Sequence, residues 1–154
     1  LMLDKKQVID FADELATVKD YLGLESIRFE ERLHVEYHIE EGAYAFKIPP
    51  MMLQTIVENA IKHGISNLVR GGVIEIKCRE GLQEELYIQV KNSGQYTPWP
   101  ITKMKEEEGG HGLYNTQQRL TLLYGDQASF RIFNSGSDFV ITEIKIPKQR
   151  LTLD

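Results

Sequence analysis

The sequence predicts an α/β fold. Five segments alternate apolar and polar residues as half-buried strands do, and three others carry apolar residues at the spacing of amphipathic helices. Strand and helix segments are interspersed along the chain, which is typical of layered α/β domains. The 154 residues are enough for one domain with a sizeable core.

The composition is that of an ordinary globular protein, with 42% hydrophobic and 27% charged residues. The net charge of −5 argues against a general nucleic-acid surface, so an anionic ligand needs a local positive patch. The residues that could form one are Lys62, His63, Lys103, Lys105 and Arg119. The single cysteine, Cys78, excludes an internal disulfide and fits a reducing compartment. No apolar run reaches membrane-spanning length, and no signal peptide is visible.

The first helix is expected from about Asp4 to Phe29. Its apolar residues fall at heptad-like positions, namely Val8, Phe11, Leu15, Val18 and Leu22. Two or three heptads do not distinguish a coiled coil from a helix packed on its own domain, so both remain open. Because the chain starts inside this helical pattern without a cap, we expect a fragment of a longer protein.

Period-two alternation predicts the strands. Leu33 to Ile39 is the first, with His34 and His38 on one face; no third metal ligand is evident, so a solvent-facing pair is favoured over a metal site. Further strands are expected at about 73–79, 85–92, 128–134 and 139–146. Cys78 is expected to be buried, and the residues after Pro147 to fray.

The segment from Leu53 to Gly64, which follows Pro49-Pro50, predicts a helix with two faces. Its apolar face is Leu53, Ile56, Val57, Ala60 and Ile61, and its polar arc is Thr55, Asn59, Lys62 and His63. An amide oxygen suits Mg²⁺, and Lys and His suit phosphate oxygens. Taken alone, a solvated polar face is the plainer interpretation. A second segment favours a metal–phosphate site.

That segment is glycine-rich, with three glycines between Gly109 and Gly112. Glycines in this density predict a loop that brings N–H groups close to a ligand. The following helix is expected to begin near Leu113 and to end near Gly125, with its positive end as an anion site. Asn115 and Arg119 lie off its apolar face. Residues 95–108 have no clear periodicity and are a candidate lid.

Asn92 is the third candidate. It lies at the end of strand 85–92, on the same side as the apolar Leu86, Ile88 and Val90, and Ser93-Gly94 follow. An asparagine in that place could read the edge of a base. The alternative is an asparagine that caps the turn through its own backbone.

Together these residues resemble the ATP-binding catalytic domain of bacterial sensor histidine kinases, in particular the LytS/YehU-type subfamily. The subfamily motif L-Q-P-L-V-E-N-A-I-K-H-G is similar to Leu53–Gly64, with Thr55 in place of Pro. The motif G-x-G-L-x-N-x-x-x-R-L, followed by L-Y-G, matches Gly110–Leu120 and Leu123–Gly125. An upstream Y-L-x-x-E-x-x-R-F matches Tyr21–Phe29. The resemblance runs from about residue 10 to Pro147.

The resemblance implies the Bergerat α/β sandwich, in which helices cover one face of a mixed sheet and ATP lies between helices and a lid. It implies an ATP-binding catalytic domain at 31–148 and, at 1–30, a linker helix toward a missing dimerisation and phosphoacceptor domain. The γ-phosphoryl group of ATP would pass to a histidine of that domain, because no histidine here has the family's Pro-His-Phe context. The resemblance further implies a cytoplasmic domain of a membrane-anchored homodimer, with a response regulator as partner and no nucleic acid.

The resemblance also assigns site residues, with ATP and Mg²⁺ as cofactors. Asn59 is the implied Mg²⁺ ligand, Lys62 and His63 approach the phosphates, and Gly110 and Gly112 present backbone amides to them. The full implied nucleotide-binding set is Asn59, Lys62, His63, Asn92, Gly94, Gly110, Gly112, Leu113, Asn115 and Arg119.

Two departures from the family pattern affect the base and phosphate sites. The usual Asp-x-Gly-x-Gly is here Asn92 to Tyr96, so base recognition lacks charge assistance and the second glycine is a tyrosine. A late Gly-Thr is replaced by Gly136-Ser137-Asp138. Two alternatives therefore stay open: a degenerate interaction domain of the same fold, and a stand-alone ATPase. Against the ATPase, no well-placed water-activating carboxylate is found.

Overall fold

The structure is a computed structural model that describes residues 2–3, 7–97, 108–148 and 150–151. Five strands form one sheet in the order β3-β5-β6-β8-β7. Their bounds are β3 Leu33–Ile39, β5 Gly72–Glu80, β6 Leu86–Ser93, β7 Ser129–Ser135 and β8 Phe139–Ile146. The β3–β5 pair is parallel and the other pairs are antiparallel, so the sheet is mixed.

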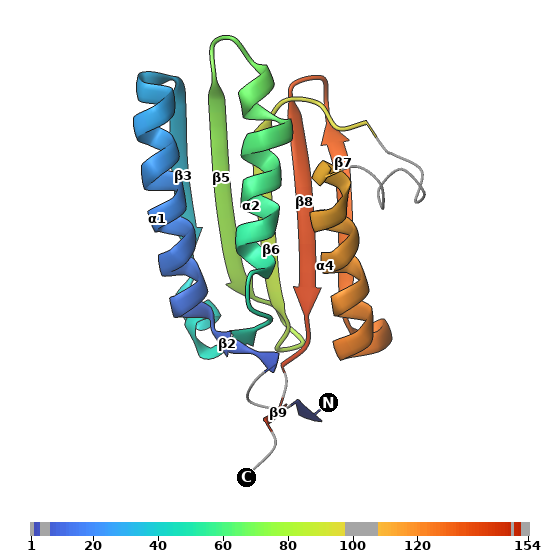
Figure 1. Ribbon diagram of the computed structural model, residues 1–154. Helices are drawn as coiled ribbons and strands as arrows, with labels where there is room; N and C mark the ends of the chain where they lie inside the picture. The colour runs from blue at the N-terminus through green and yellow to red at the C-terminus, as the bar shows by residue number, and fades with distance from the viewer. Residues whose placement is uncertain (1, 4–6, 98–107, 149, 152–154) are drawn as a thin grey trace.

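Three helices cover one face of this sheet (Figure 1). They are α1 Phe11–Phe29, α2 Met52–His63 and α4 Glu108–Tyr124. Both chain ends lie at the end of the sandwich where α1 begins (Figure 1). The α/β sandwich predicted from the sequence is therefore confirmed, with its strands within a residue or two of the expected bounds.

Short elements complete the chain. Single turns of 3₁₀ helix lie at Glu30–Arg32, Glu41–Ala45, Ile65–Asn67 and Gly125–Gln127. β2, Ile9–Asp10, pairs antiparallel with β4, Lys47–Ile48, and β1, Met2–Leu3, pairs parallel with β9, Arg150–Leu151.

The first helix begins later than the sequence predicted, at Phe11 instead of near Asp4. The reason is that Ile9 and Asp10 find a partner strand: the Phe11 N–H donates to the Phe46 carbonyl at 3.0 Å, and Asp10 forms an ion pair with Lys47. The expected frayed tail is also wrong in part, because residues 150 and 151 pair with residues 2 and 3.

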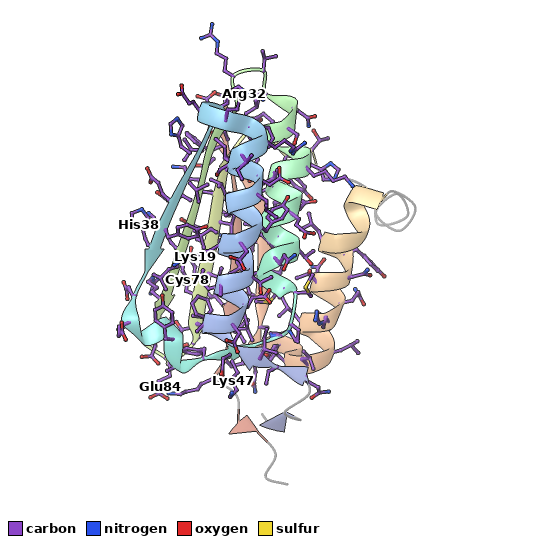
Figure 2. All side chains as sticks on the ribbon, turned by 60° about the vertical axis from the view of Figure 1, so that its left-hand side comes forward. Lys19, Arg32, His38, Lys47, Cys78 and Glu84 are labelled. Atoms are coloured by element: carbon purple, nitrogen blue, oxygen red, sulfur yellow. The ribbon has the colours of Figure 1, made fainter. Side chains whose placement is uncertain are left out.

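The core lies between the helices and the inner face of the sheet. α1 contributes Phe11, Leu15, Val18, Leu22 and Phe29, all buried, so this helix packs on its own domain. Lys19 also lies 5.2 Å from the centre of the Tyr37 ring and joins α1 to β3 (Figure 2). Cys78 is buried on β5 as expected, and its burial raises the pKa of the thiol to about 12.

α2 begins at a strained turn that its neighbours stabilise. Met51 precedes the helix with a φ of 68°, in the left-handed region, and has no side-chain cap of its own. The buried carboxylate of Glu14, on α1, accepts the N–H groups of Met51 at 3.0 Å and Gln54 at 3.1 Å. The Arg119 guanidinium, on α4, donates to the Pro50 carbonyl. Both flanking helices therefore hold the start of α2 in place.

The glycine-rich segment is helical, which corrects the expectation of a loop ending near Leu113. α4 starts at Glu108, so Gly109, Gly110 and Gly112 belong to its first turns. Close packing explains one of them: a Cβ on Gly112 would lie 2.9 Å from Thr55 Cγ2 on α2. Contact between the two helices offsets the ~1 kcal/mol that a glycine costs in a helix. Residues 98–107 of the expected lid lie outside the described residues.

Candidate functional site

A narrow cleft lies between the C-terminal half of α2 and the adjoining ends of β6, β7 and β8. The residues that line it are Ile56, Asn59, Ala60, His63, Gly64, Asn92, Gln95, Tyr96, Ile132, Val140 and Thr142. The cleft is partly open to solvent and offers about 30 Å³ of free space. The fold thus brings together three residues that the sequence singled out on separate segments: Asn59, His63 and Asn92.

Asn92 is the polar residue at the base of this cleft. It is buried, with 4% of its surface exposed, at the end of the apolar inner row of β6. Its Nδ2 donates to the Ser93 carbonyl at 2.9 Å, so the turn-capping interpretation is confirmed. The same bond leaves the amide oxygen as the group that Asn92 can offer to a ligand. Asn92 therefore both caps the turn after β6 and lines the cleft.

Two glycines allow α2 and β6 to meet at this point. A Cβ on Gly64 would lie 2.3 Å from Asn92 Nδ2, which is closer than atoms can approach. Gly94 has a φ of 131°, which other residues rarely adopt, and a Cβ there would lie 3.2 Å from the Gly64 Cα. The glycine that ends the Leu53–Gly64 motif therefore makes room for Asn92.

Asn59 and His63 are the polar residues that line the cleft from α2, and Lys62 lies between them in the sequence. Asn59 is half-buried and lines the cleft, and His63 lines it from one turn further along. Lys62 is exposed beside them. Partial burial, and then the charge of Lys62, lower the pKa of His63. The imidazole is therefore mostly neutral near pH 7.

Thr142 is a site residue that the sequence reading missed. It lies on β8, is 5% exposed, and lines the cleft next to Val140. Its hydroxyl can both donate and accept a hydrogen bond. The available signal was a single polar residue in the inward row Val140, Thr142, Ile144 and Ile146.

Other predicted site residues lie elsewhere. Arg119 contacts Pro50 at the opposite end of α2 from His63, and Asn115 is exposed on α4. Leu113 is buried at the edge of a separate depression of about 460 Å³, between α4 and β7. Gly94 forms the turn after β6, and Gly110 lies in the first turn of α4. The structure gathers the α2 and β6 residues of the predicted set, but not Asn115 or Arg119.

A cluster outside the cleft involves one of the two histidines of β3. His38 Nε2 lies 3.6 Å from the carboxylates of both Glu36 and Glu75, and Lys77 lies 3.4 Å from Glu75. His38 projects from the face of the sheet that the helices leave open (Figure 2). Glu36, His38 and Glu75 could each offer one ligand atom to a metal ion, so the expectation that no third ligand is evident is wrong for His38, although Glu36 and His38 are exposed to solvent. Among the described residues, no helix is both long and apolar enough to span a lipid bilayer.

Comparison with known proteins decides the family. The chain is 31% identical over 153 residues to the sensor protein LytS of Enterococcus faecalis. The aligned region covers 95% of this chain and 26% of that protein. It is 34% identical over 152 residues to the sensor histidine kinase YpdA of Escherichia coli, and this aligned region covers 96% of this chain and 26% of that protein. The chain belongs to the sensor histidine kinase family. It corresponds to the catalytic domain of these kinases and spans about a quarter of their length.

Solved structures support the fold of this kinase domain. A nucleotide-free catalytic domain of the histidine kinase ThkA matches with a TM-score of 0.66, over 93% of this chain and 96% of that one. At 13% identity, the match concerns the fold alone. No protein-family model matches the chain.

Proposed function

We propose that this kinase domain binds Mg–ATP in the cleft between α2 and β6 and presents the γ-phosphate to a histidine of another domain. The convergence of Asn59, His63 and Asn92 in one cleft carries the proposal. The cleft holds two amides and an imidazole, and the charge of the neighbouring Lys62 acts on the imidazole of His63. This combination suits a hard cation, phosphate oxygens and a base edge.

The donor set fits the proposed ligands. Mg²⁺ in nucleotide sites keeps several waters and phosphate ligands, so one amide oxygen, from Asn59, is a sufficient protein contribution. Lys62 and His63 would contact phosphate oxygens, and Gly110, in the first turn of α4, would supply a backbone N–H group. Gly112 lies one turn further, where the helix uses its N–H group, so its role remains implied by the resemblance alone. Asn92 would accept a hydrogen bond from the adenine amino group, with Gly94 setting the turn beside it. Leu113, Asn115 and Arg119 remain implied by the resemblance alone.

The domain's own contribution would be positioning and charge neutralisation. Bound Mg²⁺ would neutralise charge on the β- and γ-phosphates, which is a large share of what phosphoryl transfer requires. Asn59, Lys62 and His63 would fix the triphosphate at the C-terminal end of α2, and Asn92 would fix the base.

The phosphoacceptor histidine would lie on another domain. His34 and His38 are exposed on β3, which is an edge strand of the sheet, and His63 lines the nucleotide cleft. We propose that the domain works in a membrane-anchored homodimer, with a dimerisation domain joined through α1 and a response regulator as the onward partner. Its relatives LytS and YpdA are described as a sensor protein and a sensor histidine kinase.

A second candidate is a non-catalytic interaction domain of the same fold. The observation that favours it is the small free space in the cleft, about 30 Å³, which is far below the few hundred Å³ typical of small-molecule sites.

Calorimetric titration with a non-hydrolysable ATP analogue, with and without Mg²⁺, separates the two candidates. The kinase proposal expects binding at millimolar concentration or below that strengthens with Mg²⁺. Asn59→Ala is expected to abolish the Mg²⁺ dependence while the domain stays folded, because Asn59 is half-buried on the surface of a helix. Absence of binding by the folded wild type would favour the interaction domain, and unfolding of Asn59→Ala would show a structural role. Steady ATP hydrolysis by the isolated chain would favour the stand-alone ATPase.

A further inference from the structure

Tyr96 stands between two hollows on the helix side of the sheet. It lines the narrow cleft beside Asn92, and it also lines the depression of about 460 Å³ between α4 and β7. Ile132 is the only other described residue common to both linings. Tyr96 therefore lies where the narrow cleft and the larger depression adjoin. Partial burial also raises the pKa of its hydroxyl, in agreement with a ring that is turned toward the protein.

The backbone of Tyr96 is fixed on both sides by one side chain. Its N–H donates to Asn134 Oδ1 at 2.8 Å, and its carbonyl accepts from Asn134 Nδ2 at 2.8 Å. We call this pair of bonds the Asn134 clamp. The two preceding residues are tied to the same hairpin, because the Gly94 N–H donates to the Asp138 carbonyl at 2.8 Å and Gln95 donates to the Ser137 carbonyl. The segment after β6 is thus fastened to the turn between β7 and β8.

From this geometry we propose that Tyr96 is a self-blocking residue of the nucleotide site. In the free domain the Asn134 clamp holds its ring in the space that the base needs next to Asn92. A purine nucleotide binds only after the ring moves aside, which joins the narrow cleft to the larger depression. This inference rests on the proposed nucleotide site and adds its gating residue.

The size of the effect follows from the clamp. Two hydrogen bonds of ordinary net strength favour the closed arrangement by roughly 5- to 150-fold. When only a small fraction of molecules is open, the apparent dissociation constant rises by the inverse of that fraction. Removal of the block should therefore tighten binding by the same factor, whereas a merely structural role would leave affinity unchanged or weaken it.

The test uses calorimetry with Mg²⁺ and a non-hydrolysable ATP analogue on wild type, Tyr96→Ala, Asn134→Ala and Tyr96→Phe. Tyr96→Ala removes the ring, and Asn134→Ala releases the clamp while the ring remains. Both are expected to lower the dissociation constant by at least roughly 5-fold. Tyr96→Phe keeps the ring and should stay within about 2-fold of wild type. Tyr44→Ala, which truncates a tyrosine packed against Phe11 at the start of α1, is the matched control and should leave the dissociation constant unchanged.

Each result bears on the inference. Binding by Tyr96→Ala without measurable binding by wild type supports it, as does tighter binding by both alanine variants. If wild type binds the analogue as tightly as Tyr96→Ala, or more tightly, the proposed block by Tyr96 is contradicted, whereas the proposed function still holds. Tightening in Tyr96→Ala but not in Asn134→Ala overturns the clamp and with it the inference. Failure of every folded variant to bind contradicts the proposed function and the inference together.

Discussion

Asn92 shows how one amide can serve both the fold and a ligand. Its nitrogen is used by the Ser93 carbonyl, and its oxygen is available to accept from a base. A carboxylate would make a stronger acceptor, because charge assistance roughly doubles the strength of a hydrogen bond. The same carboxylate would also place an oxygen against the Ser93 carbonyl, where the amide donates now.

Asn92→Asp is therefore expected to tighten binding of adenine nucleotides by about 5-fold and to destabilise the domain by about 1 kcal/mol. Titration with ADP and with a guanine nucleotide, together with a thermal melt, measures both effects. Only the adenine affinity should change. An unchanged adenine affinity would count against Asn92 as the base-reading residue.

Glu143, which lies outside the cleft, makes the stability of the fold depend on pH. Burial alone would raise the pKa of this carboxyl, but hydrogen bonds from Tyr87 and Arg131 hold it below its ordinary value. A carboxyl with a lowered folded pKa stabilises the fold above its unfolded pKa, and this stability is lost as the pH falls through the folded pKa.

Glu143→Gln is accordingly expected to lower stability near neutral pH and to flatten its fall below about pH 4.5. Thermal melts of both proteins between about pH 7 and pH 3 test this expectation. Parallel curves would mean that the Tyr87–Glu143–Arg131 network contributes nothing that depends on the charge of Glu143.

At the scale of elements, the start of α2 depends on its neighbours. Met51 supplies no cap, and Glu14 accepts two N–H groups from a different helix. Because Glu14 is 2% exposed, its loss would leave two part-buried N–H groups without their acceptor at the start of α2.

Glu14→Ala is expected to destabilise the domain by about 2–4 kcal/mol, as two part-buried donors lose their acceptor. Asp20→Asn, an exposed carboxylate on the same helix, is the matched control and should stay within about 0.5 kcal/mol. Urea unfolding measures both changes. Equal effects of the two substitutions would show that the cap contributes no stability.

The elements that the sequence predicted best are those with a clean local period. Strands 33–39 and 139–146 were placed at the observed bounds, because their inward and outward rows alternate without interruption. The start of α4 was wrong, since the glycine density favoured a loop and only the contact between Gly112 and Thr55 explains a helix there. The Glu14 cap could not be predicted either, because it joins residues that are far apart in the sequence.

On the scale of the whole molecule, topology assembles the cleft. α2 lies on the inner face of the sheet, and the end of β6 places Asn92 under the C-terminal turn of α2 (Figure 1). The motifs indicated candidate residues for the site, but not how the fold brings them together. The motifs do not include Thr142 or Asn134. The positions of these two residues next to the cleft depend on the register of β7 and β8 beside β6.

The arrangement of the helices also explains why Arg119, which the sequence assigned to the nucleotide-binding set together with Asn115, lies away from the cleft. Arg119 is on the second half of that helix, where it contacts the start of α2 and not its end. Their spacing in the motif is compatible with either place, so sequence alone could not decide.

The most direct test of a nucleotide site between α2 and β6 is to map by NMR which backbone amides respond to nucleotide. On titration with Mg²⁺ and a non-hydrolysable ATP analogue, we expect the largest shifts at Asn59, His63, Asn92 and Gly94. Gln89 and Lys91, whose side chains alternate to the opposite face of β6, should shift least. Shifts centred on that outer face, or none at saturating ligand in the folded domain, would contradict a nucleotide site between α2 and β6.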